Sequence, residues 1–286
     1  MKVTVFGATG VVGRALVPLL SGHELTVVSR SPRDEPGVHW VVADAATGEG
    51  VAEALAGAEV AYYLVHSLGA RDFEEQDRAA AETVARAAEA AGVRQIVYLG
   101  GLGADDPDAS AHLRSRRETG ERLASGRVPV TTLRAAMIVG KGSAAFETIL
   151  GLVKRLPVMI TPTWVSTPTQ PIALDDVAAY LAGVCGKDGA IGAGFDAGGP
   201  EVMTYRQMIE RIARLLGRSP TIVEVPVLTP YLSALWLNLV TPVNASVARP
   251  LVEGLRNPTI AREERIRQLV PLELTSFDEA ARRALA

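Results

Sequence analysis

Apolar residues change spacing repeatedly along the first half of the chain. Short runs of β-branched and aromatic residues at 3–6, 25–28 and 38–42 predict strands, and similar runs follow at 59–65, 95–99 and 130–139. Between the later strands, apolar residues three and four positions apart predict helices over 73–91 and 110–123. The strand segments are continuous apolar runs, which is typical of a parallel sheet buried on both faces. The pattern therefore predicts an α/β fold with right-handed crossovers.

The pattern changes after Gly140. A predicted helix at 146–156 is followed by a proline-rich irregular stretch at 157–171, and Asp175 is expected to cap a helix over 177–184. Residues 195–199 read as a return to the first part. Thr204 to Gln207 and Ser276 to Glu279 have the spacing of capping boxes that open two more helices.

Three glycines follow the first predicted strand, in the sequence Gly7-Ala8-Thr9-Gly10-Val11-Val12-Gly13. A buried strand that turns into a helix through such a loop is the arrangement that binds a dinucleotide pyrophosphate. Gly7 permits the tight turn, Gly10 lets the backbone approach the phosphates, and Gly13 lets the helix pack on the strand. The N–H groups of the first helical turn then face the anion.

These patterns together predict a Rossmann-type, doubly wound parallel sheet with a small, mostly helical C-terminal portion. We place the NAD(P)-binding domain at 1–140, with segments near 168–200 returning to it. The smaller portion and the C-terminal helices occupy 141–286. The 286 residues are enough for one large domain with an appendage of this size.

The second predicted strand ends in Ser29-Arg30. In dinucleotide folds the end of this strand reaches the adenosine ribose, where an acidic residue would bind the hydroxyls of NAD. Arg30 instead offers planar donors to a 2′-phosphate, and Ser29 offers a hydroxyl. This favours NADP(H) over NAD(H), and the alternative is a solvated surface arginine.

Asp44 and His66 follow the third and fourth predicted strands, at the edge where open α/β sheets bind ligands. Asp44 suits either the adenine amino group or the cap of a local turn, and the sequence leaves both interpretations open. His66 suits either acid–base chemistry or a packing role, and these too remain open.

The composition of the chain argues against some classes of ligand and partner. A net charge of −3 without a basic block argues against nucleic acid. The single cysteine, Cys185, excludes an internal disulfide and a cysteine-based metal site, and we expect no metal. The first strand begins at once, so we expect no signal peptide and a cytoplasmic location.

Residues 225–248 carry no formal charge. Prolines interrupt the stretch, and its helical part is too short to cross a bilayer, so we expect no integral membrane span. A lid over a small-molecule substrate, a face for a homodimer or another protein partner, and a buried core helix all remain open.

Motifs over the first two thirds of the chain resemble the atypical and extended branch of the short-chain dehydrogenase/reductase superfamily, especially its NmrA-like and isoflavone-reductase-like members. The resemblance is carried by the glycine loop, Asp44, the strand end Tyr62–His66, Leu133-Arg134, and Gln170–Ala173 with Asp175-Asp176-Val177. It implies a Rossmann domain with a small C-terminal substrate-binding portion. It also implies a cofactor site with the following members: Gly7, Thr9, Gly10, Val11 and Val12 at the pyrophosphate, Arg30 at the 2′-phosphate, Asp44 and Ala45 near adenine, and Leu64 and Val65 beside the nicotinamide ribose. We add Ser29 and Gly100 to the expected cofactor residues.

The chain departs from the superfamily's catalytic signature, a serine after the fifth strand and a Tyr-x-x-x-Lys on the next helix. Gly100 or Gly101 stands at the serine place, Leu113 at the tyrosine place and Arg117 at the lysine place. Leu113 cannot transfer a proton, whereas Arg117 can bind the nicotinamide ribose. His66 and His112 are the remaining candidates for catalysis, besides water.

Two functions from different classes follow. The first is an NADPH-dependent reductase of a quinone, enone or imine, with Trp164, Tyr231 and Trp236 around the substrate. The second is a non-catalytic NADP(H)-binding redox sensor or accessory protein of the NmrA type, which the missing catalytic set favours. A structural accessory that docks through 225–248 is a third hypothesis.

Overall fold

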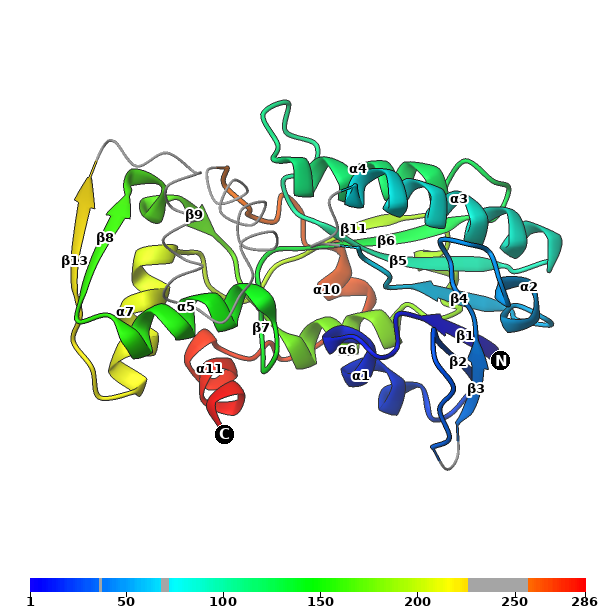
Figure 1. The fold of residues 1–286 in the computed structure, drawn as a ribbon, viewed down its shortest axis with the longest axis horizontal. Helices are drawn as coiled ribbons and strands as arrows, with labels where there is room; N and C mark the ends of the chain where they lie inside the picture. Colours follow the sequence, from blue (N-terminus) through cyan, green and yellow to red (C-terminus); the bar gives the residue numbers. More distant parts are fainter. Residues whose placement is uncertain (36–37, 68–71, 226–256) are drawn as a thin grey trace.

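The structure is a computed structural model that describes residues 1–35, 38–67, 72–225 and 257–286. Its centre is a seven-stranded, all-parallel sheet with the order β11-β6-β5-β4-β1-β2-β3 (Figure 1). The strands are β1 (Lys2–Phe6), β2 (Glu24–Ser29), β3 (His39–Val42), β4 (Val60–Tyr63), β5 (Gln95–Gly101), β6 (Val130–Ala135) and β11 (Gly194–Ala197). The expected Rossmann-type parallel sheet is confirmed.

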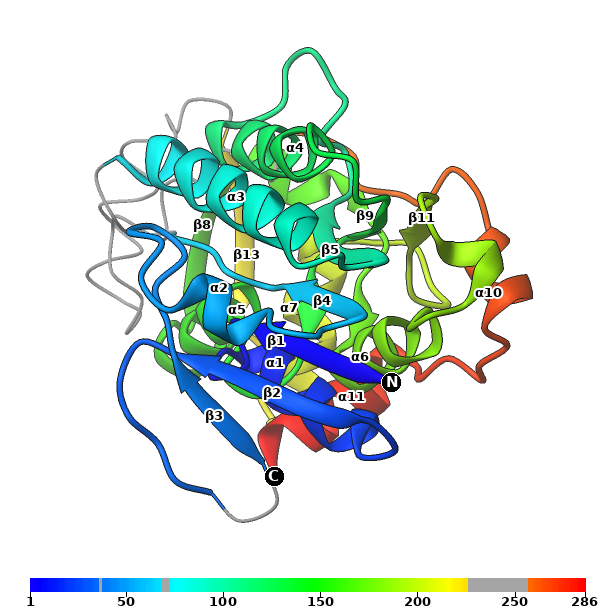
Figure 2. The ribbon, with the colours of Figure 1, turned by 90° about the vertical axis from the view of Figure 1, so that its right-hand side faces the viewer.

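Helices cover both faces of the sheet, which makes two separate cores. On one face lie α2 (Val51–Ala54), α3 (Phe73–Ala90) and α4 (Ala111–Leu123), and on the other lie α1 (Val11–Leu16) and α6 (Leu174–Gly183) (Figure 2). Buried Tyr63 and Tyr98 pack toward α3 and α4, whereas buried Tyr62 and Tyr180 belong to the core under α1 and α6. Burial on both faces explains why the strands are continuous apolar runs in the sequence.

The strand order reverses between β1 and β4. From β1 the chain runs outward to β2 and β3, then crosses back to β4 on the other side of β1. The carboxyl ends of these two strands diverge and leave a crevice, which is where doubly wound sheets bind ligands. The glycine loop and His66 both follow strands that end at this crevice.

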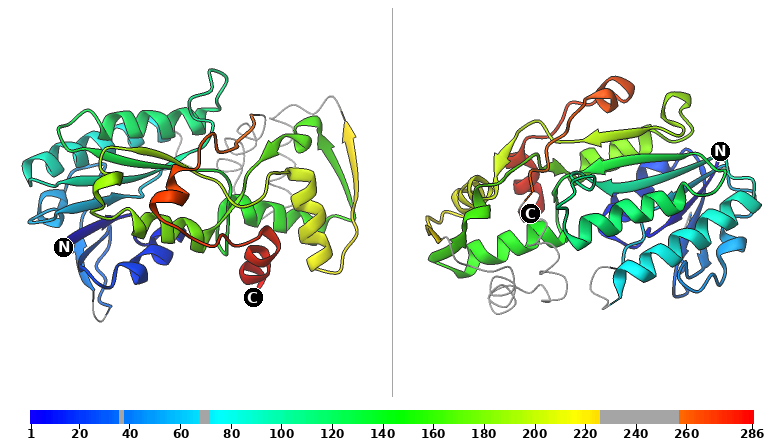
Figure 3. Two further views of the ribbon diagram at one scale, coloured as in Figure 1. Left: turned by 180° about the vertical axis from the view of Figure 1, so that it is seen from behind. Right: turned by 90° about the horizontal axis from the view of Figure 1, so that it is seen from above.

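A second group of elements lies at the opposite end of the molecule from β2 and β3 (Figures 1 and 3). It contains α5 (Ala144–Arg155), α7 (Tyr205–Leu215) and α11 (Phe277–Leu285), which share a core around Phe146, Met208 and Phe277. Beside them, β8 (Val158–Pro162) pairs in parallel with β13 (Thr221–Val225). Shorter elements complete the chain: the 3-10 helices η1 (Val17–Leu20), η2 (Thr163–Ser166) and η3 (Asp188–Ala190), the strands β7 (Ile138–Val139), β9 (Pro168–Thr169), β10 (Ile172–Ala173) and β12 (Met203–Thr204), and the helix α10 (Arg265–Leu269).

Some expected boundaries are wrong. Helix α6 begins at Leu174, so Asp175 lies inside its first turn and pairs with Arg283 instead of capping the helix. The Thr204–Gln207 capping box is present at α7. Strand β11 pairs with β6, so the chain re-enters the main sheet after the second group has begun. The division of the chain at 140 into two domains stays a prediction.

Candidate functional site

The glycine loop joins β1 to α1, and each of its glycines meets a different constraint. Gly7 has φ of +83°, and a Cβ there would lie 2.6 Å from the Leu64 carbonyl oxygen. A Cβ at Gly13 would lie 2.4 Å from the Gly7 carbonyl oxygen, so α1 can approach the loop only because Gly13 has no side chain. A Cβ at Gly10 would have the Gly7 carbonyl oxygen, at 3.2 Å, as its sole close neighbour among the described residues. Gly10 is therefore the glycine whose missing side chain leaves room for something other than the protein itself.

Two cavities meet at this loop. The β2-side cavity, of about 540 Å³, lies over the ends of β1, β2 and β3. The β5-side cavity, of about 360 Å³, lies over β5, β6 and the starts of α4 and α5. Four residues line both cavities, namely Gly7, Gly10, Leu64 and His66. The two cavities therefore form one groove along the carboxyl edge of the sheet.

The sequence-predicted cofactor residues gather along this groove. The β2-side cavity is lined by Gly7, Thr9, Gly10, Ser29, Arg30, Asp44, Ala45, Leu64 and Val65, and the β5-side cavity adds Val11, Val12 and Gly100. The one exception is Arg117, which lines neither cavity. The structure thus brings these residues together, and the contact of each with a cofactor stays a prediction.

Arg30 and Asp44 differ in whether their side chains already have hydrogen-bond or ion-pair partners within the described part of the protein. Arg30 is exposed at the end of β2 and has no carboxylate partner within the described part of the chain. Its guanidinium is therefore free to bind an anion in the β2-side cavity. One carboxylate oxygen of Asp44 accepts the backbone N–H of Ala46 at 2.8 Å, which is the local turn interaction that the sequence left as one alternative. Asp44 also lines the cavity, so its contact with adenine, the second alternative, stays a prediction.

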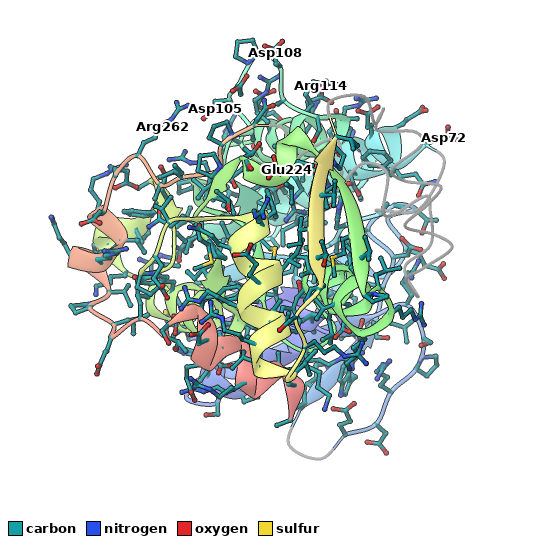
Figure 4. All side chains as sticks on the ribbon, turned by 90° about the vertical axis from the view of Figure 1, so that its left-hand side faces the viewer. Asp72, Asp105, Asp108, Arg114, Glu224 and Arg262 are labelled. Atoms are coloured by element: carbon teal, nitrogen blue, oxygen red, sulfur yellow. The ribbon has the colours of Figure 1, made fainter. Side chains whose placement is uncertain are left out.

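The β5-side cavity is mostly apolar. Its wall includes Leu99, Leu113, Ala135, Met137 and Ile138. Arg116 is the charged residue in its described lining. Further charged side chains lie on the loop after β5 and at the start of α4, where Asp105, Asp108 and Arg114 lie at the top of the view in Figure 4. An apolar chamber of this kind suits a small hydrophobic molecule.

A cluster of polar side chains interrupts this apolar wall. His66 and His112 both line the cavity, and their ring centroids are 5.1 Å apart. His66 Nδ1 lies 2.9 Å from a carboxylate oxygen of Asp77, which is almost completely buried on α3. Ser115, on α4, donates its hydroxyl to the same oxygen at 3.3 Å. The cluster thus joins the loop after β4 to α3 and α4.

Burial and charge shape the ionisation of this cluster. Burial lowers the pKa of His66 below its ordinary value, although the hydrogen bond with Asp77 acts in the opposite direction. Burial, together with His66 and Arg116, lowers the pKa of His112 to about 3. Burial acts to raise the pKa of Asp77, but hydrogen bonds with His66 and Ser67 hold it below its usual range. At neutral pH the cluster therefore contains one carboxylate and two neutral imidazoles.

Arg116 occupies the place in the cavity wall that the sequence analysis gave to Arg117. Arg116 donates to the Leu99 carbonyl oxygen, and its guanidinium lies 5.4 Å from the centroid of the Tyr98 ring. The Arg117 side chain instead pairs with Glu121 at 3.5 Å along α4. Adjacent helix positions point about 100° apart, so Arg116 and Arg117 face different surroundings. The contact of Arg117 with the nicotinamide ribose stays a prediction.

Leu113, which the sequence analysis set at the tyrosine place of the superfamily, lines the β5-side cavity. That assignment stays a prediction. A Cβ at Gly101 would lie 2.9 Å from Leu113 Cδ2. Leucine at 113 and glycine at 101 therefore fit each other, and a serine at 101 would require Leu113 to move.

Sequence reasoning missed several residues of this site, among them Asp77, Ser115, Arg116, Tyr205 and Thr259. A signal existed for Asp77, because it lies on the buried face of α3 with Ala81, Val84 and Ala88. A carboxylate on an apolar helix face calls for a buried partner. Tyr205 and Thr259 enter the cavity from segments far along the chain, and no local pattern marks them. Burial raises the pKa of Tyr205 to about 12.

The predicted substrate residues are not placed by the structure. Tyr231 and Trp236 lie outside the described residues, as does all of the uncharged stretch except Val225. Trp164 falls within η2, and its side chain is outside the description. Across the described ranges, no helix has both the length and the apolar character to span a membrane. The same residues contain no cluster of histidine, cysteine and carboxylate side chains able to hold a metal ion.

Comparison with known proteins finds similarity to NAD(P)H-binding proteins. Residues 7–137 match the NAD(P)H-binding family. A reductase of Streptomyces griseus, (4-alkanoyl-5-oxo-2,5-dihydrofuran-3-yl)methyl phosphate reductase, is 29% identical over 224 residues, which cover 76% of this chain and 74% of that protein. The alpha subcomplex subunit 9 of mitochondrial NADH dehydrogenase (ubiquinone) from Arabidopsis thaliana is 26% identical over 240 residues, or 78% of this chain. The match spans only 60% of that subunit.

Solved structures show the same fold. The NADPH-dependent quinone oxidoreductase of Escherichia coli, in complex with NADPH, superposes with a TM-score of 0.79 at 21% identity, with both chains covered completely. The comparisons confirm the predicted Rossmann-type fold, the nicotinamide cofactor and the similarity to NAD(P)H-binding reductases.

Proposed function

We propose, from the premise that residues 7–137 belong to the NAD(P)H-binding family, that the chain is an NADPH-dependent reductase of a small apolar or conjugated acceptor. The observation that carries this proposal is the continuous groove, in which a polar β2-side cavity and an apolar β5-side cavity meet at Gly10. A dinucleotide has the same division, with a phosphorylated adenosine half and a nicotinamide half joined by a pyrophosphate.

The β2-side cavity supplies the groups that the adenosine half needs. Arg30 and Ser29 would bind the 2′-phosphate, because a guanidinium without a carboxylate partner gains most from an anion. Gly10 would let the backbone approach the pyrophosphate, since the position of its missing side chain is open to the groove. These contacts support NADPH over NADH.

The β5-side cavity would hold the nicotinamide ring and the acceptor. A bound reduced nicotinamide supplies a hydride, and the protein must place the acceptor beside it and exclude water. Leu99, Leu113 and Met137 offer an apolar wall that suits a quinone, an enone or a cyclic imine. Such acceptors need less acid assistance than a simple ketone, which agrees with leucine at the tyrosine place.

The names of two similar proteins agree with this substrate class. One is a quinone oxidoreductase, and the other is a reductase of an oxodihydrofuran that carries an alkanoyl group and a methyl phosphate. A second candidate function, an NADP(H)-binding sensor or accessory protein, is favoured by Leu113 and by the likeness to a subunit of a larger mitochondrial enzyme. In that case the groove would hold the dinucleotide and turn nothing over.

Calorimetry and absorbance together test the proposal. NADPH and NADH are titrated into the protein, and oxidation of NADPH is then followed with benzoquinone, naphthoquinone, cyclohexenone and a cyclic imine as acceptors. We expect tighter binding of NADPH than of NADH, and oxidation with at least one acceptor. Binding of NADPH without oxidation by any acceptor would overturn the reductase and support the sensor.

A further inference from the structure

Asp77 is a buried carboxylate on α3, whose other charged residues are exposed or half-buried. Its side chain is almost wholly shielded from solvent, and it accepts hydrogen bonds from the Ser67 backbone N–H at 2.8 Å and from the Ser115 hydroxyl at 3.3 Å. A third partner is His66 Nδ1, at 2.9 Å. Burying a charge is costly unless it is paired and hydrogen-bonded, so three partners on one carboxylate indicate that Asp77 is held in its ionised form.

An ionised Asp77 determines where His66 carries its proton. A carboxylate only accepts hydrogen bonds, so His66 Nδ1 must donate and therefore bears the hydrogen. In the neutral imidazole, Nε2 is then an acceptor with a free lone pair. His66 Nε2 is buried and has no hydrogen-bond partner within the described part of the chain.

His112 presents a second nitrogen without a partner close by. Its Nδ1 is also buried and unsatisfied by any described residue, and its ring is tilted by 44° against that of His66. Buried polar atoms almost always have partners, and exceptions point to catalysis or to a missing ligand. Two exceptions on adjacent imidazoles that line one cavity indicate a place where a ligand atom completes the bonding.

We propose that Asp77 is a positioning residue that holds His66 in the Nδ1–H tautomer, and that His66 Nε2, assisted by His112, transfers the proton in the β5-side cavity. The inference rests on the proposed reductase function and names its proton donor. Ser115 and the Ser67 backbone fix the carboxylate, Asp77 fixes the imidazole, and the imidazole faces the acceptor.

In the proposed reduction, NADPH supplies the hydride and water supplies the proton through His66. Reduction of the acceptor requires a hydride, which carries both electrons, and one proton. The proton leaves Nε2–H of a protonated His66, which returns to the neutral Nδ1–H tautomer and is reprotonated by water. Asp77 stabilises the protonated imidazole through the hydrogen bond at 2.9 Å. Arg116, which faces both imidazoles from α4, opposes their protonation.

Nitrogen-15 NMR reports the tautomer of each histidine without any cofactor. The chain has only four histidines, so the resonance of His66 can be assigned from a His66→Gln variant. We expect the Nδ1–H tautomer for His66 in the wild type. In Asp77→Asn the amide N–H₂ faces Nδ1 in place of the carboxylate oxygen, because the other oxygen must keep accepting the Ser67 N–H. The tautomer should therefore switch to Nε2–H.

The matched control is Glu82→Gln, which removes another carboxylate from α3, one that is solvent-exposed and pairs with Arg122 at 3.0 Å. With benzoquinone as acceptor, Asp77→Asn should lower kcat about a hundredfold, the usual contribution of a positioned acid or base, with NADPH affinity changed less than about twofold. The wild-type rate should fall as pH rises through the pKa of His66, and in Asp77→Asn this fall should move to lower pH.

The outcomes separate the two proposals. A wild-type His66 in the Nε2–H tautomer overturns the positioning role of Asp77, whatever the activity. Equal kcat in Asp77→Asn and Glu82→Gln overturns the proton-transfer role. NADPH that binds but is oxidised with no acceptor overturns the proton transfer together with the reductase, even where the tautomer is as expected.

Discussion

The two cavities of the groove are formed by residues that are differently distributed along the sequence. The β2-side cavity is made by short stretches that follow three strands: the glycine loop, Ser29-Arg30 and Asp44-Ala45. The polar cluster of the β5-side cavity joins Asp77, His66 and His112 from three separate elements. The first cavity depends mainly on backbone shape, and the second on side chains that a single sequence does not show to be neighbours. Cofactor binding and chemistry should therefore respond to different substitutions.

The largest effect is expected where the cavities meet. In Gly10→Val the side chain would occupy the groove, because the protein itself approaches a Cβ there only at the Gly7 carbonyl oxygen. We expect NADPH affinity to fall by at least about a hundredfold, or about 3 kcal/mol, measured by calorimetry. Gly22→Val is the control, since nothing lies within 4 Å of a Cβ at that position. Equal NADPH affinity in the two variants would show that the glycine loop does not hold the pyrophosphate.

Arg30→Glu tests the β2-side cavity alone. Loss of a charge-assisted hydrogen bond, and repulsion of the 2′-phosphate, should weaken NADPH binding by about 10- to 100-fold, with NADH binding unchanged or improved. Arg33→Glu is the control, because Arg33 lies over the Trp40 ring and pairs with Glu35. The ratio of the two affinities, measured by calorimetry, should reverse in the first variant only. An unchanged ratio would remove Arg30 from the cofactor site.

The β5-side cavity should make the protein sensitive to acid. The pKa of His112 is lowered from 6.5 to about 3 in the folded state, so unfolding takes up a proton between these values. Stability from this group is complete above pH 6.5 and falls as the pH drops towards 3, and the lowered pKa values of His66 and Asp77 act in the same direction.

Chemical denaturation at pH 7 and pH 5 measures this dependence. The loss of unfolding free energy between the two pH values should be about 2 kcal/mol smaller in His112→Asn than in the wild type. His39→Asn is the control, because His39 is exposed on β3. The same loss in both variants would show that His112 is not held neutral by the fold.

The fold was predictable because most strands of the main sheet carry their own signal. Continuous apolar runs predicted six strands of the main sheet, and the glycine loop predicted the ligand-binding edge. The seventh strand, β11, was expected only as a return of the chain to the first part, because its sequence GFDA is not an apolar run. Element ends were less predictable. The β4 strand ends at Tyr63, two residues before the expected end, because the chain must leave the sheet at the crevice.

The chemistry was predictable only in part. His66 and His112 were identified as candidates, but their closeness depends on how α4 packs over the end of β4, which no local pattern encodes. The position of Asp77 on the apolar face of α3 indicated burial, but its partners His66 and Ser115 come from other elements and could not be read from the sequence. Arg116, and not Arg117, lines the cavity. Which of two neighbouring helix residues faces a cavity depends on how α4 packs against the sheet, and the sequence does not show this packing.

We propose that nicotinamide bound in this groove gives its hydride to an acceptor in the β5-side cavity. Rapid mixing of the protein, holding a sub-stoichiometric amount of NADPH, with the best acceptor of the panel tests it in a single turnover. The account predicts that the absorbance of the reduced nicotinamide decays faster on the wild-type protein than in free solution, and much more slowly on Asp77→Asn. A bound nicotinamide that decays no faster than free NADPH with every acceptor would contradict it.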